Sequence, residues 1–313
     1  MSPETALPLI SSAYIYGVDD PRLPYLATRV FPGAQQLRLA VGQDSKKVVA
    51  ELPPETQWFV WHAMPTYKSS MPRHRDALIQ TLQDRSIVSI NARVTDISKR
   101  HLQTVLAGLG LPTTEAADEG PPEEKLFLKS NLNYGGRAER LLAQEVRDYF
   151  GIATPHKLTP EFSTYRVAER QHVQPIAYNL ADVFVERFIA NKDDQFYRAF
   201  VLFDAVVLSR IVADGVIKKA LDAKQREDCF LTFSEESTGF PSAPDDLTRR
   251  IMVDVASFCK AFGLEMGAVD VLTDDKNVPY IIDANSTAWG GENCDRPGFL
   301  DHLRSGLQGV RTQ

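Results

Sequence analysis

The stretch that most limits what this chain can fold into is MGAVDVLTDDKNVPYIIDAN, residues 266–285. A short apolar run surrounds Asp270, a polar turn follows it, and a second β-rich run ends with Asp283 and Asn285. Two such runs around a short polar turn predict a β-hairpin. A register centred on the turn sets Asp270 opposite Asp283, and the alternation of side chains along a strand puts Asn285 on the same face.

Two carboxylates that face each other across a hairpin repel one another unless a positive charge lies between them. The three side chains offer only oxygen and amide groups, and no Cys or His lies within the stretch. Oxygen donors suit Mg²⁺, which proteins hold with one or two carboxylates together with nucleotide phosphates, and Mn²⁺ accepts the same donors. The sequence therefore predicts a cation site at the hairpin, with an ordinary solvated hairpin as the alternative.

The overall composition limits the classes of partner. With 313 residues, of which 43% are hydrophobic, the chain can bury the cores of two or three packed subdomains. Its 35 basic and 41 acidic residues give a formal charge of -6, which provides no general attraction for nucleic acid or for an anionic membrane. No apolar run approaches the ~20 residues that cross a bilayer, and the N-terminus lacks the pattern of a signal peptide, so we expect a cytoplasmic protein. The cysteines are widely spaced and odd in number, which indicates neither a disulfide framework nor a zinc site.

The N-terminal part of the chain predicts a small α/β domain. Residues 57–62 (QWFVWH) and 87–90 (IVSI) have the continuous apolar pattern of buried parallel strands, with a helix over 71–83 between them. This βαβ order is typical of doubly wound domains, in which ligands gather beyond the carboxyl ends of the strands. The loop after the first strand carries a basic cluster, which is either a solvated helix start or a contact for a carboxylate-bearing substrate: Lys68, Arg73, His74 and Arg75.

A first lysine of interest opens a helix. Asp96 or Ser98 can cap this helix, whose apolar stripe ends just before Gly110. Lys99 falls in the first turn, where the helix dipole disfavours a cation unless an anion is near. A surface lysine is the alternative.

A second lysine, Lys129, ends the short apolar strand LFLK, which leads into the loop SNLNYGGRAE and a helix over 137–150. The consecutive glycines Gly135 and Gly136 let backbone N–H groups approach phosphate oxygens, and the N-terminus of the following helix favours negative charge. The loop is neither a Walker A sequence nor a GxGxxG fingerprint. Because a Gly-Gly turn between a strand and a helix is common, this motif does not identify a ligand by itself.

The C-terminal half places arginines inside apolar strands. Residues 183–189 (VFVERFI) predict one strand, and residues 196–212 predict further strands that contain Arg198 and Arg210. An arginine in an apolar run costs desolvation unless it meets an anion, and an ion pair within the core, for instance with Glu186, is the alternative. An amphipathic helix over 245–262 then leads to the hairpin.

The order of these parts resembles the ATP-grasp superfamily. A lysine opens a helix, a second lysine precedes a glycine loop, a strand carries VERF, an arginine lies in the next strand, and Asp with Asp-x-Asn forms the hairpin. The resemblance covers roughly residues 91–285 and, with the N-terminal domain, the whole chain. It implies an α/β (α+β) fold in which two α+β subdomains clasp ATP. The expected parts are a pre-ATP-grasp domain (1–95), a central subdomain with a glycine-rich lid (96–182) and a C-terminal subdomain with the metal site (183–313).

The resemblance also implies a role for each part of the site. Asp270, Asp283 and Asn285 match the ligands of Mg²⁺ ions that bridge the ATP phosphates. Since the central ligand is usually Glu, the shorter Asp283 leaves the number of metal ions open. YGGRAE is a loose version of the family's lid. The other matches are two lysines on the α- and β-phosphates (Lys99 and Lys129), the lid itself (Asn133 to Ala138, with Gly135 and Gly136), the linker that reads adenine (Glu186, Arg187 and Phe188), a ribose contact (Asp193 or Asp194), an arginine near the γ-phosphate (Arg198) and an arginine for the reacting carboxylate (Arg210).

The activity that the resemblance implies is that of an ADP-forming carboxylate-amine ligase. ATP phosphorylates the carboxylate of an amino acid or peptide-like substrate, and an amine then displaces phosphate from the acyl-phosphate. A small-molecule acid and an amine are the expected partners, and a homodimer is left open. The alternatives are a small-molecule kinase, which stops at phosphoryl transfer, and a nucleotide-binding protein without catalysis. We expect the N-terminal domain and the loop after Asn285, which contains Trp289, to select the acid and the amine.

Overall fold

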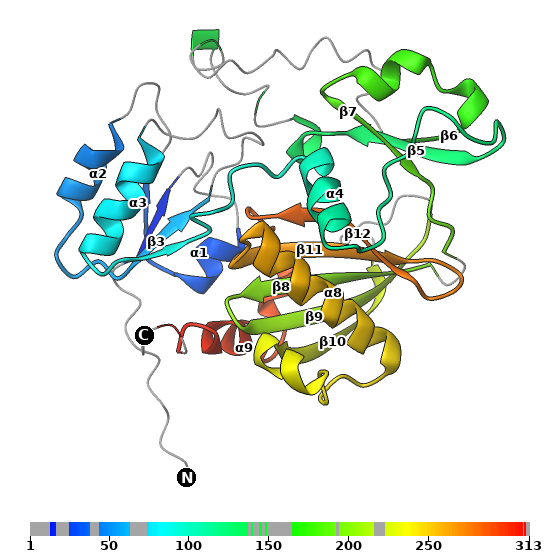
Figure 1. Ribbon diagram of the computed structural model, residues 1–313. Helices are drawn as coiled ribbons and strands as arrows, with labels where there is room; N and C mark the ends of the chain where they lie inside the picture. Colours follow the sequence, from blue (N-terminus) through cyan, green and yellow to red (C-terminus); the bar gives the residue numbers. More distant parts are fainter. Residues whose placement is uncertain are drawn as a thin grey trace.

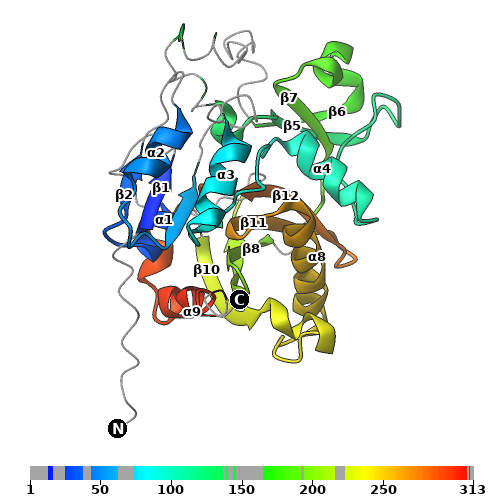
Figure 2. The same cartoon turned by 60° about the vertical axis from the view of Figure 1, so that its left-hand side comes forward.

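The computed structural model describes residues 13–16, 25–37, 44–62, 74–136, 139, 144–145, 148, 165–191, 194–215, 223–308 and 310. Within these ranges the chain forms a parallel sheet near its N-terminus, a small antiparallel sheet in its middle and a larger antiparallel sheet toward its C-terminus (Figures 1 and 2). No helix in these ranges combines the length and the apolar character needed to span a bilayer.

The N-terminal sheet has parallel strands in the order β2-β1-β3-β4. Its elements in chain order are β1 (Ala13–Tyr16), α1 (Leu26–Val30), β2 (Gln35–Leu37), α2 (Ser45–Glu51), β3 (Trp58–Trp61), α3 (Arg75–Asp84) and β4 (Val88–Ile90). Every residue of β3 is buried and apolar, as a strand covered on both faces requires. The predicted βαβ unit is therefore confirmed.

The basic cluster ahead of α3 includes a structural residue. Arg75 is buried, and its guanidinium donates to three backbone carbonyls after β4 at 2.7–3.3 Å. It also lies over the ring of Trp61, 4.0 Å from the centroid. Arg75 thus ties α3 to the end of the domain, and a solvated helix start is the wrong interpretation for this residue. His74 is exposed at the start of α3, whereas Lys68 and Arg73 lie outside the described residues.

The central sheet is antiparallel, in the order β6-β5-β7. Its strands are β5 (Lys125–Ser130), β6 (Arg166–Glu169) and β7 (Val183–Arg187), and short 3-10 turns span Asn133–Gly136, Arg170–His172 and Pro175–Asn179. The expected boundary after residue 182 would assign β7 to the C-terminal subdomain. However, β7 pairs with β5 along its whole length, and Val183 and Val185 share a core with Leu126 and Leu128. β7 therefore belongs to the central sheet.

The C-terminal sheet is antiparallel, in the order β10-β9-β8-β11-β12. Its elements are β8 (Gln195–Leu202), β9 (Ala205–Ala213), β10 (Ala223–Thr232), a 3-10 turn (Phe233–Thr238), α8 (Asp246–Phe262), β11 (Met266–Thr273), β12 (Pro279–Asn285), a 3-10 turn (Glu292–Asp295) and α9 (Phe299–Ser305). One face packs against α8, and the other packs against α9 and α1. β10 is an edge strand whose residues are mostly polar and accessible to solvent, so the apolar patterns that indicate the other strands do not predict it.

Helix α4 (Lys99–Gly108) connects the central and C-terminal parts. Ser98 caps it by accepting from the backbone N–H of His101 at 3.3 Å. The apolar stripe was expected in the central subdomain, but Leu102 and Leu106 pack in the core formed by the C-terminal sheet and α8. Figure 1 shows α4 beside β12 and α8. As a result, Lys99 is placed directly over the hairpin.

Asn91 fixes the hairpin against the N-terminal domain. Its side chain is buried, accepts from the backbone N–H groups of Glu265 and Met266 at 2.9 and 3.0 Å, and donates to the Met266 carbonyl at 2.8 Å. The Glu265 carboxylate accepts in return from the Asn91 backbone at 2.7 Å. Because β11 starts at Met266, these bonds set where the hairpin begins relative to the parallel sheet.

Candidate active site

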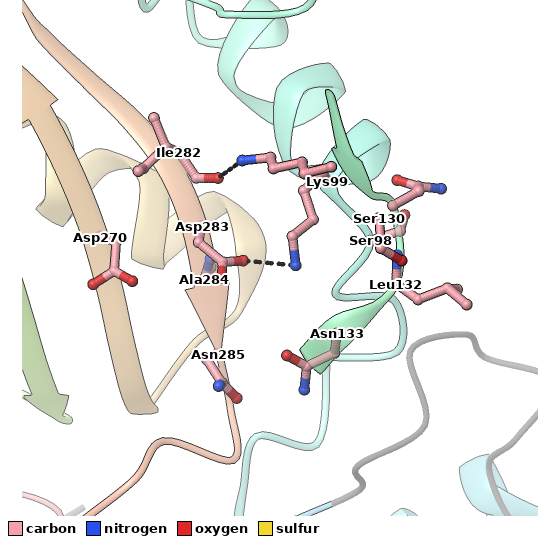
Figure 3. A network of polar contacts seen from close by, with 12 residues as sticks. Ser98, Lys99, Ser130, Leu132, Asn133, Asp270, Ile282, Asp283, Ala284 and Asn285 are labelled. Atoms are coloured by element: carbon pink, nitrogen blue, oxygen red, sulfur yellow. Dashed lines mark hydrogen bonds and ion pairs between the residues drawn. The ribbon is translucent and has the colours of Figure 1, made fainter. Parts of the chain in front are cut away.

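The hairpin of β11 and β12 forms the floor of the site. Asp270 pairs with Asp283 across the strands, in the register expected from the sequence. Figure 3 shows Asp270, Asp283 and Asn285 next to one another along this hairpin. After Asp270 the register shifts, so that Val271 pairs with Ile281 and one extra residue, Ile282, forms a β-bulge.

Each of the two opposed carboxylates is held by a cation from another element. Arg198 lies on β8 directly opposite Asp270, and its Nε and Nη2 donate to the two carboxylate oxygens at 2.6 and 2.7 Å. Lys99 Nζ lies 3.0 Å from Asp283 Oδ1 (Figure 3). The repulsion inferred from the sequence is thus offset by two side chains, one from a neighbouring strand and one from a helix N-terminus.

The third predicted ligand, Asn285, has its amide oxygen fixed by Thr287. Both the backbone N–H and the hydroxyl of Thr287 donate to Asn285 Oδ1 at 2.8 Å. The Thr287 hydroxyl also accepts from Asn133 Nδ2 at 3.4 Å, and both of these residues are buried. The start of the glycine loop is therefore connected to the hairpin end through one threonine.

Lys129 reaches the same hairpin from β5. Its buried ammonium lies 3.0 Å from Glu186 Oε1 and donates to the Ile282 carbonyl at 3.0 Å. The neighbouring carbonyl of Ile281 accepts from the Gln103 side chain at 3.3 Å. At the bulge, two successive carbonyls of the outer strand β12 are therefore available to side chains from other elements. Lys129 contacts Ile282, and Lys99 contacts Asp283. The two lysines that the sequence predicts to bind phosphate therefore contact consecutive residues of β12.

Glu186 and its neighbours are engaged with the protein. The Glu186 carboxylate pairs with Lys129 and accepts from the Thr114 hydroxyl at 2.8 Å. The backbone N–H groups of Arg187 and Phe188 donate to the carbonyls of Thr114 and Lys125 at 2.7 and 3.0 Å. This segment borders Lys129, and its role as the linker that reads adenine stays a prediction, because those two N–H groups already donate to carbonyls of the protein.

The glycine loop begins as the 3-10 turn Asn133–Gly136, which follows β5 after Asn131 and Leu132. Gly135 and Gly136 have φ values of +63° and +74°, a left-handed conformation that favours glycine. The rest of the predicted lid, Arg137 and Ala138, lies outside the described residues, as does Asp193 of the predicted ribose pair. Asp194 is described, also with a positive φ, and its carbonyl accepts from the Ala213 backbone at 3.0 Å.

Arg210 does not join this site. The register of β8 and β9 pairs Arg198 with Ser209 and Tyr197 with Arg210, so the two arginines lie on opposite faces of the sheet. Arg210 is exposed, and its Nη2 lies 3.3 Å from Glu227 Oε2 on the edge strand β10. The expectation that Arg198 and Arg210 contact one substrate is therefore wrong for this fold.

Three polar residues that sequence reasoning missed lie on the same face as Arg198. Ser209 is its partner on β9 and is fully buried, and Asp228 is the partner of Ser209 on β10. The Ser209 hydroxyl donates to Asp228 at 2.7 Å, and the Arg296 guanidinium contacts both residues. Of these three residues, only Arg296 could have been singled out from the sequence, because it belongs to the loop after Asn285 that we expect to select the substrate.

The donor set of the hairpin fits a hard cation. Among the described residues no group of three or more His, Cys, Asp or Glu side chains forms a metal cluster. Two carboxylates with one amide oxygen are nevertheless the donors that Mg²⁺ uses when substrate phosphates complete its coordination. The Asn285 oxygen is held in a fixed orientation, and Asp270 and Asp283 are direct cross-strand partners on one face of the hairpin.

A buried histidine lies where the N-terminal domain meets the loop after the hairpin. His62 follows β3, is completely buried, and its ring packs edge-on against Tyr25 with centroids 4.8 Å apart. Burial lowers the pKa of His62 to about 3, so its ring is neutral at physiological pH. The Tyr25 backbone bridges to Trp289, which is partly buried. Trp289 therefore packs at this junction.

Comparisons with known proteins place this geometry in a fold family. Searches against protein-family models and against curated protein sequences found no match. Solved structures do match over nearly the full length. One is the ATP-grasp ligase PsnB in complex with a phosphomimetic variant of its minimal precursor, Mg and ADP, with a TM-score of 0.54, 12% identity, and coverage of 96% of this chain and 99% of that chain.

Two further structures agree. The macrocyclase MdnC from Microcystis aeruginosa MRC, bound with the precursor peptide MdnA, gives a TM-score of 0.52 at 12% identity over 96% of this chain and 100% of that one. A RiPP-associated ATP-grasp ligase from Chryseobacterium gregarium gives 0.52 at 10% identity over 97% and 98%. This chain has the ATP-grasp fold. The ATP-grasp fold that the order of the sequence motifs predicts is therefore confirmed.

Proposed function

We propose that the protein is an ATP-dependent ligase that activates a carboxylic acid as an acyl-phosphate and joins it to an amine, releasing ADP and phosphate. The observation that carries this proposal is the pair of opposed carboxylates, Asp270 and Asp283, each contacted by a cation from a different element. Such an arrangement suits phosphoryl transfer, because carboxylates can hold the metal while cationic side chains neutralise charge on the phosphates.

The nucleotide and its metal would be divided among the residues as follows. Asp270, Asp283 and Asn285 would hold Mg²⁺, which when bound neutralises charge on the phosphate oxygens. Lys99 and Lys129, both almost fully buried, would bind phosphate oxygens, and so would backbone N–H groups of the glycine loop. Because these lysines lie in a site with little water, their charge acts on the phosphates with little screening.

The proposed reaction has two steps. A carboxylate oxygen of the acid forms a bond to the γ-phosphorus, while the bond from that phosphorus to the β,γ-bridging oxygen breaks and ADP leaves. The amine nitrogen then bonds to the acyl carbon, the bond from that carbon to the phosphate oxygen breaks, and the proton lost from nitrogen leaves with hydrogen phosphate. Arg198, beside Asp270, stabilises the transferring phosphoryl group in the first step.

The proteins of similar fold support a broad choice of acids. PsnB and MdnC were solved with precursor peptides, and another structure of this fold, D-cycloserine synthetase DcsG, has a TM-score of 0.50 at 10% identity over 95% of this chain and 97% of that one. The acid of the present protein can therefore be sought both among free amino acids and among Asp or Glu side chains in peptides.

The test uses the purified protein with Mg-ATP, pooled L-amino acids or short peptides that contain Asp or Glu, and hydroxylamine as the nucleophile. A ligase gives a hydroxamate, with ADP and inorganic phosphate in equal amounts, and a cognate amine suppresses the hydroxamate. Arg198→Gln should abolish the signal, whereas Arg249→Gln, which alters an exposed pair with Asp246 on α8, should not. A stable phosphorylated acid without free phosphate would instead identify a kinase, and ATP binding without turnover a non-catalytic protein.

A further inference from the structure

The acid needs a cationic group on the face of the sheet that carries Asp270, and Arg210 cannot supply it from the opposite face. A polar row crosses this face. It joins direct cross-strand partners on five neighbouring strands: Asp228, Ser209, Arg198, Asp270 and Asp283. Since neighbouring strands lie about 4.8 Å apart, Ser209 is one strand spacing from Arg198 and two from Asp270. The row therefore leads away from the metal ligands toward β10.

Arg296 covers the β10 end of this row. Its two terminal nitrogens each lie 3.3 Å from the Ser209 hydroxyl, and Nη1 also donates to Asp228. The guanidinium packs over Phe299, 4.8 Å from the ring centroid, which restricts its orientation. The side chain is not sealed off, since the exposed fraction is 20% for Arg296 and 22% for Arg198.

The two arginines differ in their support. Arg198 is held by Asp270, to which the proposed function gives the metal, so it would contact the γ-phosphate. Arg296 is held by Ser209 and Asp228, one strand further on, and it follows Asn285 in the chain by only a short loop. A planar guanidinium binds a carboxylate through two parallel hydrogen bonds, which orient the carboxylate as well as attract it.

We propose that Arg296 binds the reacting carboxylate of the acid substrate, an inference that rests on the proposed ligase function. The guanidinium orients the carboxylate so that one oxygen faces the γ-phosphate beside Arg198. Ser209 and Asp228 are positioning residues that hold the guanidinium against the sheet. Substrate selection by the loop after Asn285 then has a physical basis, because this loop supplies the carboxylate-binding group.

The first measurement is acid-dependent ADP release with the acid that the hydroxamate screen identifies, and with hydroxylamine as nucleophile. Arg296→Gln should raise the KM for the acid about tenfold or more, while the Kd of Mg-ATP from calorimetry stays within about twofold of wild type. Arg296→Lys keeps the charge but loses the planar pair of donors, so it should restore only part of the acid affinity. Arg249→Gln is the matched control, an arginine whose acidic partner lies on the same helix, far from the row in sequence.

A purely structural ion pair would behave differently. If Arg296 only tethers its loop, Asp228→Asn and Arg296→Gln should lower the melting temperature alike and leave the KM for the acid equal to that of wild type. That result, or a raised acid KM in Arg210→Gln but not in Arg296→Gln, overturns the inference while the ligase proposal stands. A wild-type protein that forms no ADP with any acid of the panel overturns both. A selective rise in acid KM for Arg296→Gln, with milder effects for Asp228→Asn, supports it.

Discussion

Lys99 Nζ lies 3.0 Å from Asp283 Oδ1, so a single ion pair joins the group expected to hold a phosphate to the group expected to hold the metal. Under the proposed function, nucleotide and metal would each compete with this ion pair for one of its two side chains. Mg-ATP would satisfy both at once, because the metal would bind the carboxylate and a phosphate would bind the ammonium. Metal alone, or ATP alone, would leave either Lys99 or Asp283 without a partner of opposite charge in a site that is largely shielded from water.

This relationship gives a prediction for Asp283→Asn. The substitution removes the competing charge from Lys99 and one source of repulsion toward phosphate, so metal-free ATP should bind more tightly. Removing a competing, partly exposed charge interaction of about 1 kcal/mol should lower the Kd for metal-free ATP roughly fivefold. Calorimetric titration of ATP in the presence of EDTA measures the affinity, and ADP release measures turnover, which should be lost. Weaker binding of metal-free ATP by the variant would show that Lys99 does not bind a phosphate.

A second prediction concerns stability and Asp270→Asn. From the sequence alone, removal of one of two facing carboxylates should relieve repulsion and stabilise the protein. The structure reverses that sign, because Asp270 is the bidentate partner of Arg198, whose side chain is only 22% exposed. Loss of a charged hydrogen-bond pair should cost about 1.5 to 3 kcal/mol in the free energy of unfolding.

Urea unfolding of the wild type, Asp270→Asn, Arg198→Gln and the double variant measures this coupling as a double-mutant cycle. The two single variants should each lose stability, and the double variant should lose less than their sum. A more stable Asp270→Asn would mean that repulsion from Asp283 outweighs the pair with Arg198.

The glycine loop supplies a third prediction. Gly136 has a φ of +74°, so any L-residue there is strained by roughly 1 to 2 kcal/mol. Gly136→Val should therefore lower stability and, because its side chain adds bulk beside the expected phosphate position, weaken ATP binding further. Gly108→Ala is the matched control, since Gly108 lies in α4 with no atom near its Cβ position, and it should be neutral or stabilising. Equal ATP affinities for wild type and Gly136→Val would mean that this turn does not contact the nucleotide.

Much of the site could be read from the sequence because it depends on local rules. The register of Asp270 and Asp283 follows from one short polar turn and from alternation, and Lys99 follows from the cap at Ser98. The partners of these groups could not be read in the same way. Lys99 and Asp283 are remote in sequence, and they meet because the apolar stripe of α4 packs on the core of the C-terminal sheet.

The face on which Arg210 lies could not be predicted for a related reason. It depends on the β8–β9 turn, where Leu202 pairs with Ala205 around two residues, Phe203 and Asp204. Phe203 adopts a positive φ of +50°, whereas turn signals in sequence depend on Gly, Asn or Asp at such positions. A change of one residue in this register would have put Arg210 on the other face. Arg198, in contrast, lies beside Asp270, which is its direct partner on β11.

The last prediction concerns the pH dependence set by His62. Burial lowers the pKa of this histidine to about 3 in the folded protein. In the unfolded chain a histidine has a pKa of about 6.5, so between these values the unfolded state binds a proton that the folded state does not. As the pH falls through this window, His62 must therefore reduce the stability of the fold, whereas above pH 7 it has no such effect.

His62→Phe removes the titration and keeps an aromatic ring against Tyr25. The free energy of unfolding of wild type minus that of His62→Phe should fall from pH 7 to pH 4, by at most about 1.4 kcal/mol for each pH unit, while the other histidines cancel in the difference. Parallel curves for the two proteins across this range would show that the His62 ring takes up a proton in the folded state, which would require a partner or solvent at this junction between the N-terminal domain and the loop after the hairpin.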